Sequence, residues 1–126
     1  KYGTMFASAL ASTSSSTFVD AFAGSSVTVP VDGDYLVIFE AESSTSAIST
    51  ESEIAVGVNS TTAASGNAER FADKLGSIGD VNPISTTAVL TGLSAGDSIH
   101  GIFRKPGGVG NAELTRRRLT ILKVTS

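Results

Sequence analysis

Few residues of this chain could do chemistry. His100 is the only histidine, so a hydrolytic Ser-His-Asp arrangement would have to use it, and no Gly-x-Ser-x-Gly motif presents a nucleophile on a strained turn. The chain has no cysteine, which excludes thiol nucleophiles and thiolate metal sites. We therefore expect His100 to be a strand residue at the surface or at a subunit contact.

Carboxylate pairs are the second group that could act chemically. Three pairs stand two residues apart: Asp32 with Asp34, Glu40 with Glu42, and Glu51 with Glu53. A calcium ion takes six to eight oxygen ligands, so turn chemistry explains the aspartates better than a metal site does. Two glutamates on one strand face, at roughly 7 Å, could serve a glycosidase, but the chain has no Trp to stack on a sugar. We expect no catalytic residue, no metal, no cofactor and no enzymatic activity.

Two further motifs have plain explanations. Residues 106–110, Pro-Gly-Gly-Val-Gly, lack the Lys-Ser/Thr ending of a phosphate loop and favour a hairpin loop. The only basic cluster combines Arg104 and Lys105 with the arginines at 116–118, in a chain with a net charge of −3. Without interleaved aromatics, this pattern does not favour nucleic-acid binding. No apolar run is long enough to span a membrane.

Residues 33–42, Gly-Asp-Tyr-Leu-Val-Ile-Phe-Glu-Ala-Glu, are predicted to form a central strand. By alternation one face carries Tyr35, Val37, Phe39 and Ala41, and the other carries Leu36, Ile38, Glu40 and Glu42. Neither face is freely polar, so we expect both to be covered. Either a second layer of the same chain or a neighbouring subunit must cover the second face.

The other segments alternate between strand patterns and turn signals. Strands are predicted at 17–22, 26–31, 53–58, 84–90, 98–104 and 114–124, with loops at 43–52, 76–83, 91–97 and 105–111. Residues 67–75 could form a strand or a short helix, and a strand is slightly favoured. About eight strands without a βαβ rhythm predict an all-β, antiparallel sandwich. Residues 1–16 form an N-terminal arm or a first strand with a Ser/Thr-rich connection, and residues 17–126 form the domain.

Three short motifs carry a resemblance to a known family. They are Gly33-Asp-Tyr-Leu-Val-Ile-Phe39, Leu93-Ser-Ala-Gly-Asp-Ser-Ile99 and the final Leu119-Thr-Ile-Leu-Lys-Val124. The pattern resembles the compact jelly rolls of the complement globular-head and tumour necrosis factor type, over roughly residues 17–124. It departs at the final strand, which lacks the family's aromatic-glycine pair. Ser/Thr-rich, cysteine-free chains of this length look most like bacteriophage capsid decoration (cement) proteins and tail-fibre heads.

The resemblance implies a jelly-roll sandwich that assembles as a homotrimer. It places the last strand antiparallel to 33–42, so we expect Arg118, and less surely Arg116, to pair with Glu40 or Glu42, within one chain or across a threefold axis. A solvated row of arginines is the alternative. The expected subunit interface consists of Leu36, Ile38, Glu40, Glu42, Arg116, Arg118 and Leu122.

The resemblance also implies a role. The leading hypothesis is a non-enzymatic virion structural protein that binds the major capsid protein on the capsid exterior and stabilises the capsid. If residues 1–10 form an arm, the expected capsid contacts are Lys1, Tyr2, Met5 and Phe6. The alternative hypothesis is a receptor- or glycan-binding head of a tail fibre or spike, using the loops at 43–52, 60–66 and 105–111.

Overall fold

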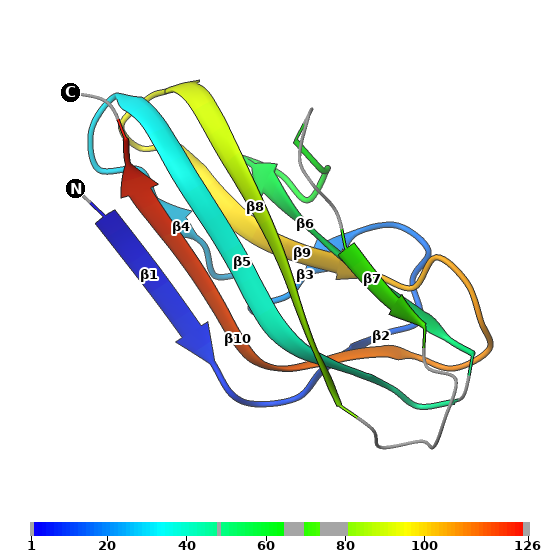
Figure 1. The fold of residues 1–126 in the computed structure, drawn as a ribbon. Helices are drawn as coiled ribbons and strands as arrows, with labels where there is room; N and C mark the ends of the chain where they lie inside the picture. The colour runs from blue at the N-terminus through cyan, green and yellow to red at the C-terminus, as the bar shows by residue number, and fades with distance from the viewer. Residues whose placement is uncertain (1, 48, 65–69, 74–80, 125–126) are drawn as a thin grey trace.

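Two antiparallel β-sheets pack face to face in the computed structural model, which describes residues 2–47, 49–64, 70–73 and 81–124 (Figure 1). Sheet A contains, in order, β1 (Tyr2–Ala7), β10 (Ala112–Lys123), β5 (Gly33–Thr45) and β8 (Asn82–Leu93), with β2 (Ala11–Thr13) also paired to β10. Sheet B contains β3 (Val19–Asp20), β9 (Ser98–Arg104), β6 (Glu51–Val58) and β7 (Arg70–Asp73), with β4 (Val27–Thr28) also paired to β9. The predicted all-β, antiparallel sandwich is confirmed.

The core forms between the inner faces of the two sheets. Tyr35, Val37 and Phe39 of β5 point inward and are fully buried, as the alternation predicts. They pack in one core with Ile54, Val56, Ile99 and Phe103 of the facing sheet B and with Leu119 and Ile121 of the neighbouring strand β10. The Tyr35 hydroxyl donates to the Val31 carbonyl at 2.7 Å, so its one polar atom is satisfied.

Gly101 allows β9 to approach the aromatic part of this core. A Cβ at this position would lie 2.7 Å from Phe22 Cε2 and 3.1 Å from Phe39 Cζ, closer than packed carbons tolerate. The rings of Phe22 and Phe39 are 5.7 Å apart and tilted by 47°. The glycine therefore serves packing, since its side of the strand has no room for a side chain.

The predicted surface loop at 43–52 is wrong at both ends. β5 continues to Thr45 and β6 begins at Glu51. Four of the hydroxyl-bearing residues in this segment are buried: Ser43, Thr45, Thr50 and Ser52. Hydroxyls can be buried when they find partners, and the Thr45 hydroxyl donates to the Ala47 carbonyl at 2.8 Å.

The loop at 105–111 contributes to this burial. The backbone amide of Glu51 donates to the Gly107 carbonyl at 3.1 Å, and that of Gly110 donates to Thr50 Oγ1 at 3.1 Å. The amide of Ser46 donates to the Asn111 carbonyl, also at 3.1 Å. The two loops therefore form one hydrogen-bonded end of the sandwich.

Other observed strands are shorter or longer than the sequence predicted. The segments 17–22 and 26–31 contain only the two-residue strands β3 and β4, whereas β8 is longer than 84–90 and takes in part of the connection predicted at 91–97. The strand at 98–104 lies where the alternation placed it. Within 67–75, Arg70–Asp73 is a strand paired with β6, as favoured; residues 67–69 and 74–75 lie outside the described residues. The described residues include no helix that could cross a membrane.

The N-terminal residues are part of sheet A. β1 pairs antiparallel with β10 from Tyr2–Leu122 to Ala7–Arg117, and β2 pairs with β10 at residues 11–13. Residues 2–7 thus form a first strand and do not extend away as an arm, and residues 11–13 of the predicted Ser/Thr-rich connection are also strand. Sheet A therefore combines strands from residues 1–16 with strands from the domain expected at residues 17–126.

A bulge in β10 separates its three arginines. The register with β5 shifts between Thr115 and Arg118, and Arg116 has a left-handed φ of 47°. Arg117 faces inward between Arg116 and Arg118 and is buried, and its Nη1 donates to the carbonyls of Ala9 and Leu114. Desolvation lowers the pKa of Arg117. Simple alternation, the basis of the predicted arginine face, holds from Arg116 to Leu122, and the bulge shifts it in the preceding residues, so that Leu114 and Ala112 also face the core.

The central packing makes a stability prediction. Replacing Phe39 by Ala should lower the free energy of unfolding by about 3 to 5 kcal/mol, because lost contacts and a cavity add together. Urea denaturation followed by circular dichroism measures this change. The control Val109→Ala, at a loop residue that is 90% exposed, should change the stability by less than about 0.5 kcal/mol. A loss below about 1 kcal/mol at Phe39 would contradict the packing described.

Candidate functional site

The outer face of sheet A, which points away from the core, brings most of the predicted interface residues together. The strand registers align its positions in rows: Phe6, Arg118, Glu40 and Ser85; then Thr4, Thr120, Ile38 and Thr87; then Leu122, Leu36 and Val89. The predicted antiparallel pairing of the last strand with 33–42 is therefore present. Strand β8 adds Val89 and Thr87, which the sequence reasoning missed although the alternation of 84–90 could have indicated them.

This outer face is more apolar than an ordinary solvated sheet. Phe6 is 57% exposed, Val89 60% and Leu122 47%, while Leu36 and Ile38 between them are half-buried. Inward residues of the same strands are covered by sheet B, but no described residue forms a second layer over the outer side. A second layer of the same chain, sheet B, therefore covers only the inner face of β5. For the outer face, the other predicted cover is a neighbouring subunit.

Charged residues gather at one end of this face, beside the bulge. Arg118 Nη1 lies 3.9 Å from Glu40 Oε1, and Arg116 Nε lies 3.5 Å from Glu42 Oε1. The guanidinium of Arg118 also lies 5.8 Å from the centre of the Phe6 ring. The expected pairing is thus present within one chain. Together with Pro83, these residues line a groove of about 640 Å³.

These ion pairs contribute little to the fold of one chain. Their side chains are between 44% and 73% exposed, so water screens the attraction. Pairs of this kind are typically worth about 0 to 1 kcal/mol. The geometry is better suited to meeting another charged surface than to stabilising the sandwich.

The structure separates the residues expected to contact a capsid. Lys1 lies outside the described residues, and Tyr2 is placed only by its register opposite Leu122. Phe6 is exposed and lies in the groove, whereas Met5 packs against the core on the other side of β1. Met5 and Phe6 therefore cannot contact one flat surface together.

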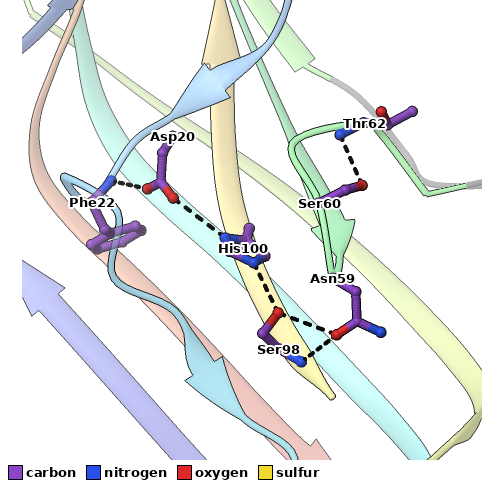
Figure 2. A network of polar contacts seen from close by, with 7 residues as sticks. All are labelled: Asp20, Phe22, Asn59, Ser60, Thr62, Ser98 and His100. Atoms are coloured by element: carbon purple, nitrogen blue, oxygen red, sulfur yellow. Dashed lines mark hydrogen bonds and ion pairs between the residues drawn. The ribbon is translucent and has the colours of Figure 1, made fainter.

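The outer face of sheet B carries a different feature, a polar network centred on His100 (Figure 2). His100 Nδ1 lies 3.3 Å from Asp20 Oδ2, and its Nε2 lies 2.9 Å from Ser98 Oγ. Asn59 Oδ1 accepts from the Ser98 backbone amide at 2.8 Å and lies 3.2 Å from the Ser98 hydroxyl. The order Ser-His-Asp matches a hydrolytic triad, but the serine lies in a regular strand and its hydroxyl has two partners within the chain.

A smaller cleft lies on the same side of the molecule. Its volume is about 440 Å³, and it is lined by Thr17, Phe18, Thr61, Thr62, Ala63 and Arg104. The guanidinium of Arg104 lies 4.5 Å from the centre of the Phe18 ring and is paired with Glu53. The cleft thus combines hydroxyls, one aromatic ring and one cation. No group of three or more His, Asp or Glu that could hold a metal occurs in the described ranges.

Comparisons with known proteins identify the fold of the chain but not its family. No protein-family model matches the chain, and no curated protein matches its sequence. Among solved structures, the chain is similar to the Eiger TNF of S. frugiperda, with a TM-score of 0.58 and 15% identity over 99% of this chain and 92% of that one. It is also similar to a chain in the structure of infectious bursal disease virus, Gx strain, with a TM-score of 0.61 and 14% identity over 100% of this chain and 32% of that one.

A third similar structure is the C-terminal CBM6 of a marine laminarinase from Zobellia galactanivorans, with a TM-score of 0.50 and 14% identity over 94% of this chain and 99% of that one. At these identities the likeness establishes a jelly-roll fold alone. This confirms the fold expected from the sequence motifs. The chain spans about a third of the virus chain that it matches.

The exposed ion pairs make the second prediction. A double-mutant cycle with Glu40→Gln and Arg118→Met should give a coupling energy below about 1 kcal/mol in the dissociated chain, because both side chains are half exposed. Urea denaturation at low protein concentration measures this energy. A coupling above about 2 kcal/mol would mean that the pair stabilises the single chain.

Proposed function

We propose that the chain is a non-enzymatic structural protein of a bacteriophage particle, a homotrimeric decoration protein that binds the capsid exterior through the major capsid protein and reinforces it. The observation that carries the proposal is the open outer face of sheet A, with its half-buried Leu36 and Ile38 and exposed Val89 and Leu122. Contiguous apolar surface of this kind is typical of protein interfaces. The jelly-roll fold shared with a virus chain is consistent with a virion role.

The charges of this face favour copies of the same chain as its occupants. Each copy presents Arg116 and Arg118 beside Glu40 and Glu42 at the same end of the sheet. When copies meet around an axis along the strands, the arginines of one lie level with the glutamates of the next. A surface with both charges is therefore complementary to itself, and burial would strengthen the weak pairs while setting the subunit register.

Trimer formation would explain how a small protein could hold a capsid firmly. Three weak contacts joined in one assembly act as one strong contact, because the second and third bind at a high effective concentration. The proposed capsid contact is the edge strand β1 with exposed Phe6, where the first strand borders the groove. The capsid then gains links between neighbouring capsomers.

The third prediction tests the oligomer. Sedimentation of the wild-type protein should give a trimer, and Ile38→Glu should give monomers, because the substitution introduces an unpaired charge at the centre of the buried face. The control Val109→Glu adds the same charge to an exposed loop and should leave the trimer intact. A wild-type protein that stays monomeric at millimolar concentration would overturn the proposal.

The fourth prediction tests the partner. Wild-type protein should co-sediment with empty phage capsids and raise the temperature at which they break, while Ile38→Glu should lose at least tenfold in apparent affinity as avidity disappears. Val109→Glu again serves as the matched control. Trimers that do not bind capsids but co-sediment with host cells would contradict the decoration role without contradicting the trimer.

The second candidate function is a receptor- or glycan-binding head, and the cleft at Phe18 and Arg104 favours it. Sugar sites combine an aromatic face with hydroxyl and charged groups, and this cleft contains all three. Binding to host cells or glycans that is lost in Phe18→Ala and kept in Phe6→Ala would support this candidate. Equal binding by both variants would contradict it.

A further inference from the structure

The smaller cleft is built from three pieces of chain. Its lining residues come from residues 17–18 ahead of β3, from Arg104 at the end of β9, and from residues 61–63 after β6. Its volume of about 440 Å³ lies within the range usual for small-ligand sites, which are largely formed before the ligand binds. The bonds that hold each piece in place therefore decide whether this cleft can act as a site.

One wall of the cleft, residues 60–63, is fixed at both of its ends. At the first end the backbone amide of Asn59 donates to the Ser98 carbonyl at 2.8 Å. Asn59 Oδ1 also accepts from the Ser98 amide at 2.8 Å (Figure 2). At the second end the Ala64 amide donates to the Val56 carbonyl at 2.9 Å. Backbone bonds to β9 and β6 thus hold this wall.

Gly57 determines how close this wall lies to β6. A Cβ at this position would lie 2.3 Å from the Ser60 carbonyl oxygen and 3.0 Å from that of Thr62. The Thr62 amide also donates to the Ser60 hydroxyl at 3.2 Å, which holds the turn of the wall (Figure 2). Since close-packed backbone has no room to yield, a larger residue at Gly57 would push the wall outward.

The opposite wall, residues 17–18, is held through Ser15. The Ser15 hydroxyl donates to the Thr17 carbonyl at 2.8 Å and accepts from the Thr17 amide at 3.1 Å. The Ser15 carbonyl accepts from the Lys105 amide at 2.8 Å, which ties this wall to the end of β9. The ring of Phe18 then lies against Arg104, whose guanidinium is 4.5 Å from the ring centre.

The guanidinium of Arg104 is held in place while part of it stays unused. Its Nε donates to Glu53, and its central carbon lies over the Phe18 ring. These contacts order the long side chain beforehand, so a ligand that binds it loses less conformational entropy. Among the residues that the structure describes, Nη1 and Nη2 of Arg104 have no hydrogen-bond partner. Their N–H donors are therefore free for a ligand.

The carboxylate of Glu53 lies deeper than the guanidinium that it holds. The Glu53 side chain is 12% exposed, against 33% for Arg104, and Glu53 does not line the cleft. The described lining residues contribute one cation, three threonine hydroxyls and a phenyl ring, but no carboxylate. A ligand in the cleft therefore meets the positive end of the ion pair.

We propose that this cleft binds a sugar that carries a carboxylate, such as a uronic acid unit of a glycan. A planar carboxylate accepts two parallel hydrogen bonds from Nη1 and Nη2 of Arg104, a fork that a lysine does not offer. The hydroxyls of Thr17, Thr61 and Thr62 can both donate to and accept from sugar hydroxyls. The inference rests on the receptor candidate offered above and names its ligand class, acidic glycans.

The fifth prediction compares two probes that differ in charge but hardly in shape, glucuronate and its neutral amide, glucuronamide. In ¹H–¹⁵N spectra both should shift the signals of Thr61 and Thr62, and glucuronate should bind at least about fivefold more tightly, because only its carboxylate accepts both bonds of the fork. Equal affinities would overturn the proposal. Inorganic phosphate that binds the same residues as tightly as glucuronate would also overturn it, since the site would then recognise an anion and not a sugar.

Variants separate the fork from the charge. Arg104→Lys keeps a cation beside Glu53 but lacks the fork, so its preference for glucuronate should fall below about twofold. The control Lys123→Arg makes the reverse exchange on β10 of sheet A and should keep the wild-type preference. Gly57→Ala should weaken the binding of both sugars, because it displaces the wall. An unchanged preference in Arg104→Lys would overturn the role of Arg104. If that variant does not fold, the two probes decide on the wild-type protein.

The outcomes distinguish this inference from the receptor role. If neither sugar shifts the cleft signals at about 100 mM, both the acidic ligand and the receptor candidate are contradicted. If glucuronamide binds as tightly as glucuronate, the receptor candidate stands and only the acidic class is wrong. If glucuronate binds as expected while Phe18→Ala leaves the binding to host cells unchanged, the ligand class stands and the receptor role is wrong.

Discussion

The whole arrangement depends on a strand, β5, that carries apolar side chains on both faces. Its inward residues Tyr35, Val37 and Phe39 are buried under sheet B, and this packing forms the core. Its outward residues Leu36 and Ile38 occupy the middle of sheet A, where β10 and β8 flank them. Burying apolar surface is the main favourable term in folding and association, so a second apolar face calls for a second partner. This one constraint links the fold of the chain to its proposed assembly.

The bulge in β10 shows how packing adapts a charged segment to this sheet. Three consecutive arginines in a regular strand would alternate between the two faces, and one of them would enter the core. This alternation already puts Arg117 on the inner face, where it donates to two backbone carbonyls, and leaves Arg116 and Arg118 on the outer face. The bulge shifts the alternation in the preceding residues, so that Leu114 and Ala112 also face the core. The exposed pairs with Glu40 and Glu42 therefore follow from the alternation, and the bulge brings two further residues into the core.

The outer faces of sheets A and B differ in what covers them. Sheet A leaves its outer face open, with apolar and charged residues in rows. On sheet B, residues 60–62 cross over Gly57, and His100 forms a polar network with Asp20, Ser98 and Asn59. Apolar surface attracts partners without directional preference, whereas a satisfied hydrogen-bond network fixes the positions of the groups that form it. The open face of sheet A is thus suited to assembly, whereas the outer face of sheet B is partly held by its own chain.

Local periodicity determined a large part of this structure. The alternation of apolar residues predicts the strand at 33–42, both of its faces and the strand at 98–104, because a period of two depends only on neighbours in the chain. The pairing of Arg118 with Glu40 or Glu42 was expected because the family resemblance placed the last strand beside the central one. The sequence also indicated an all-β, antiparallel sandwich through its turn residues.

Only the tertiary structure decided the long-range contacts that neither the periodicity nor the family resemblance predicted. Asp20 and His100 are separated by 80 residues, and their contact depends on two-residue strands whose pairing no local pattern indicates. The burial of Thr50 likewise depends on the loop at 105–111, where the Gly110 amide donates to Thr50 Oγ1. Whether a polar side chain is exposed or buried is set by what the fold brings against it, and the chain alone carries no local sign of that.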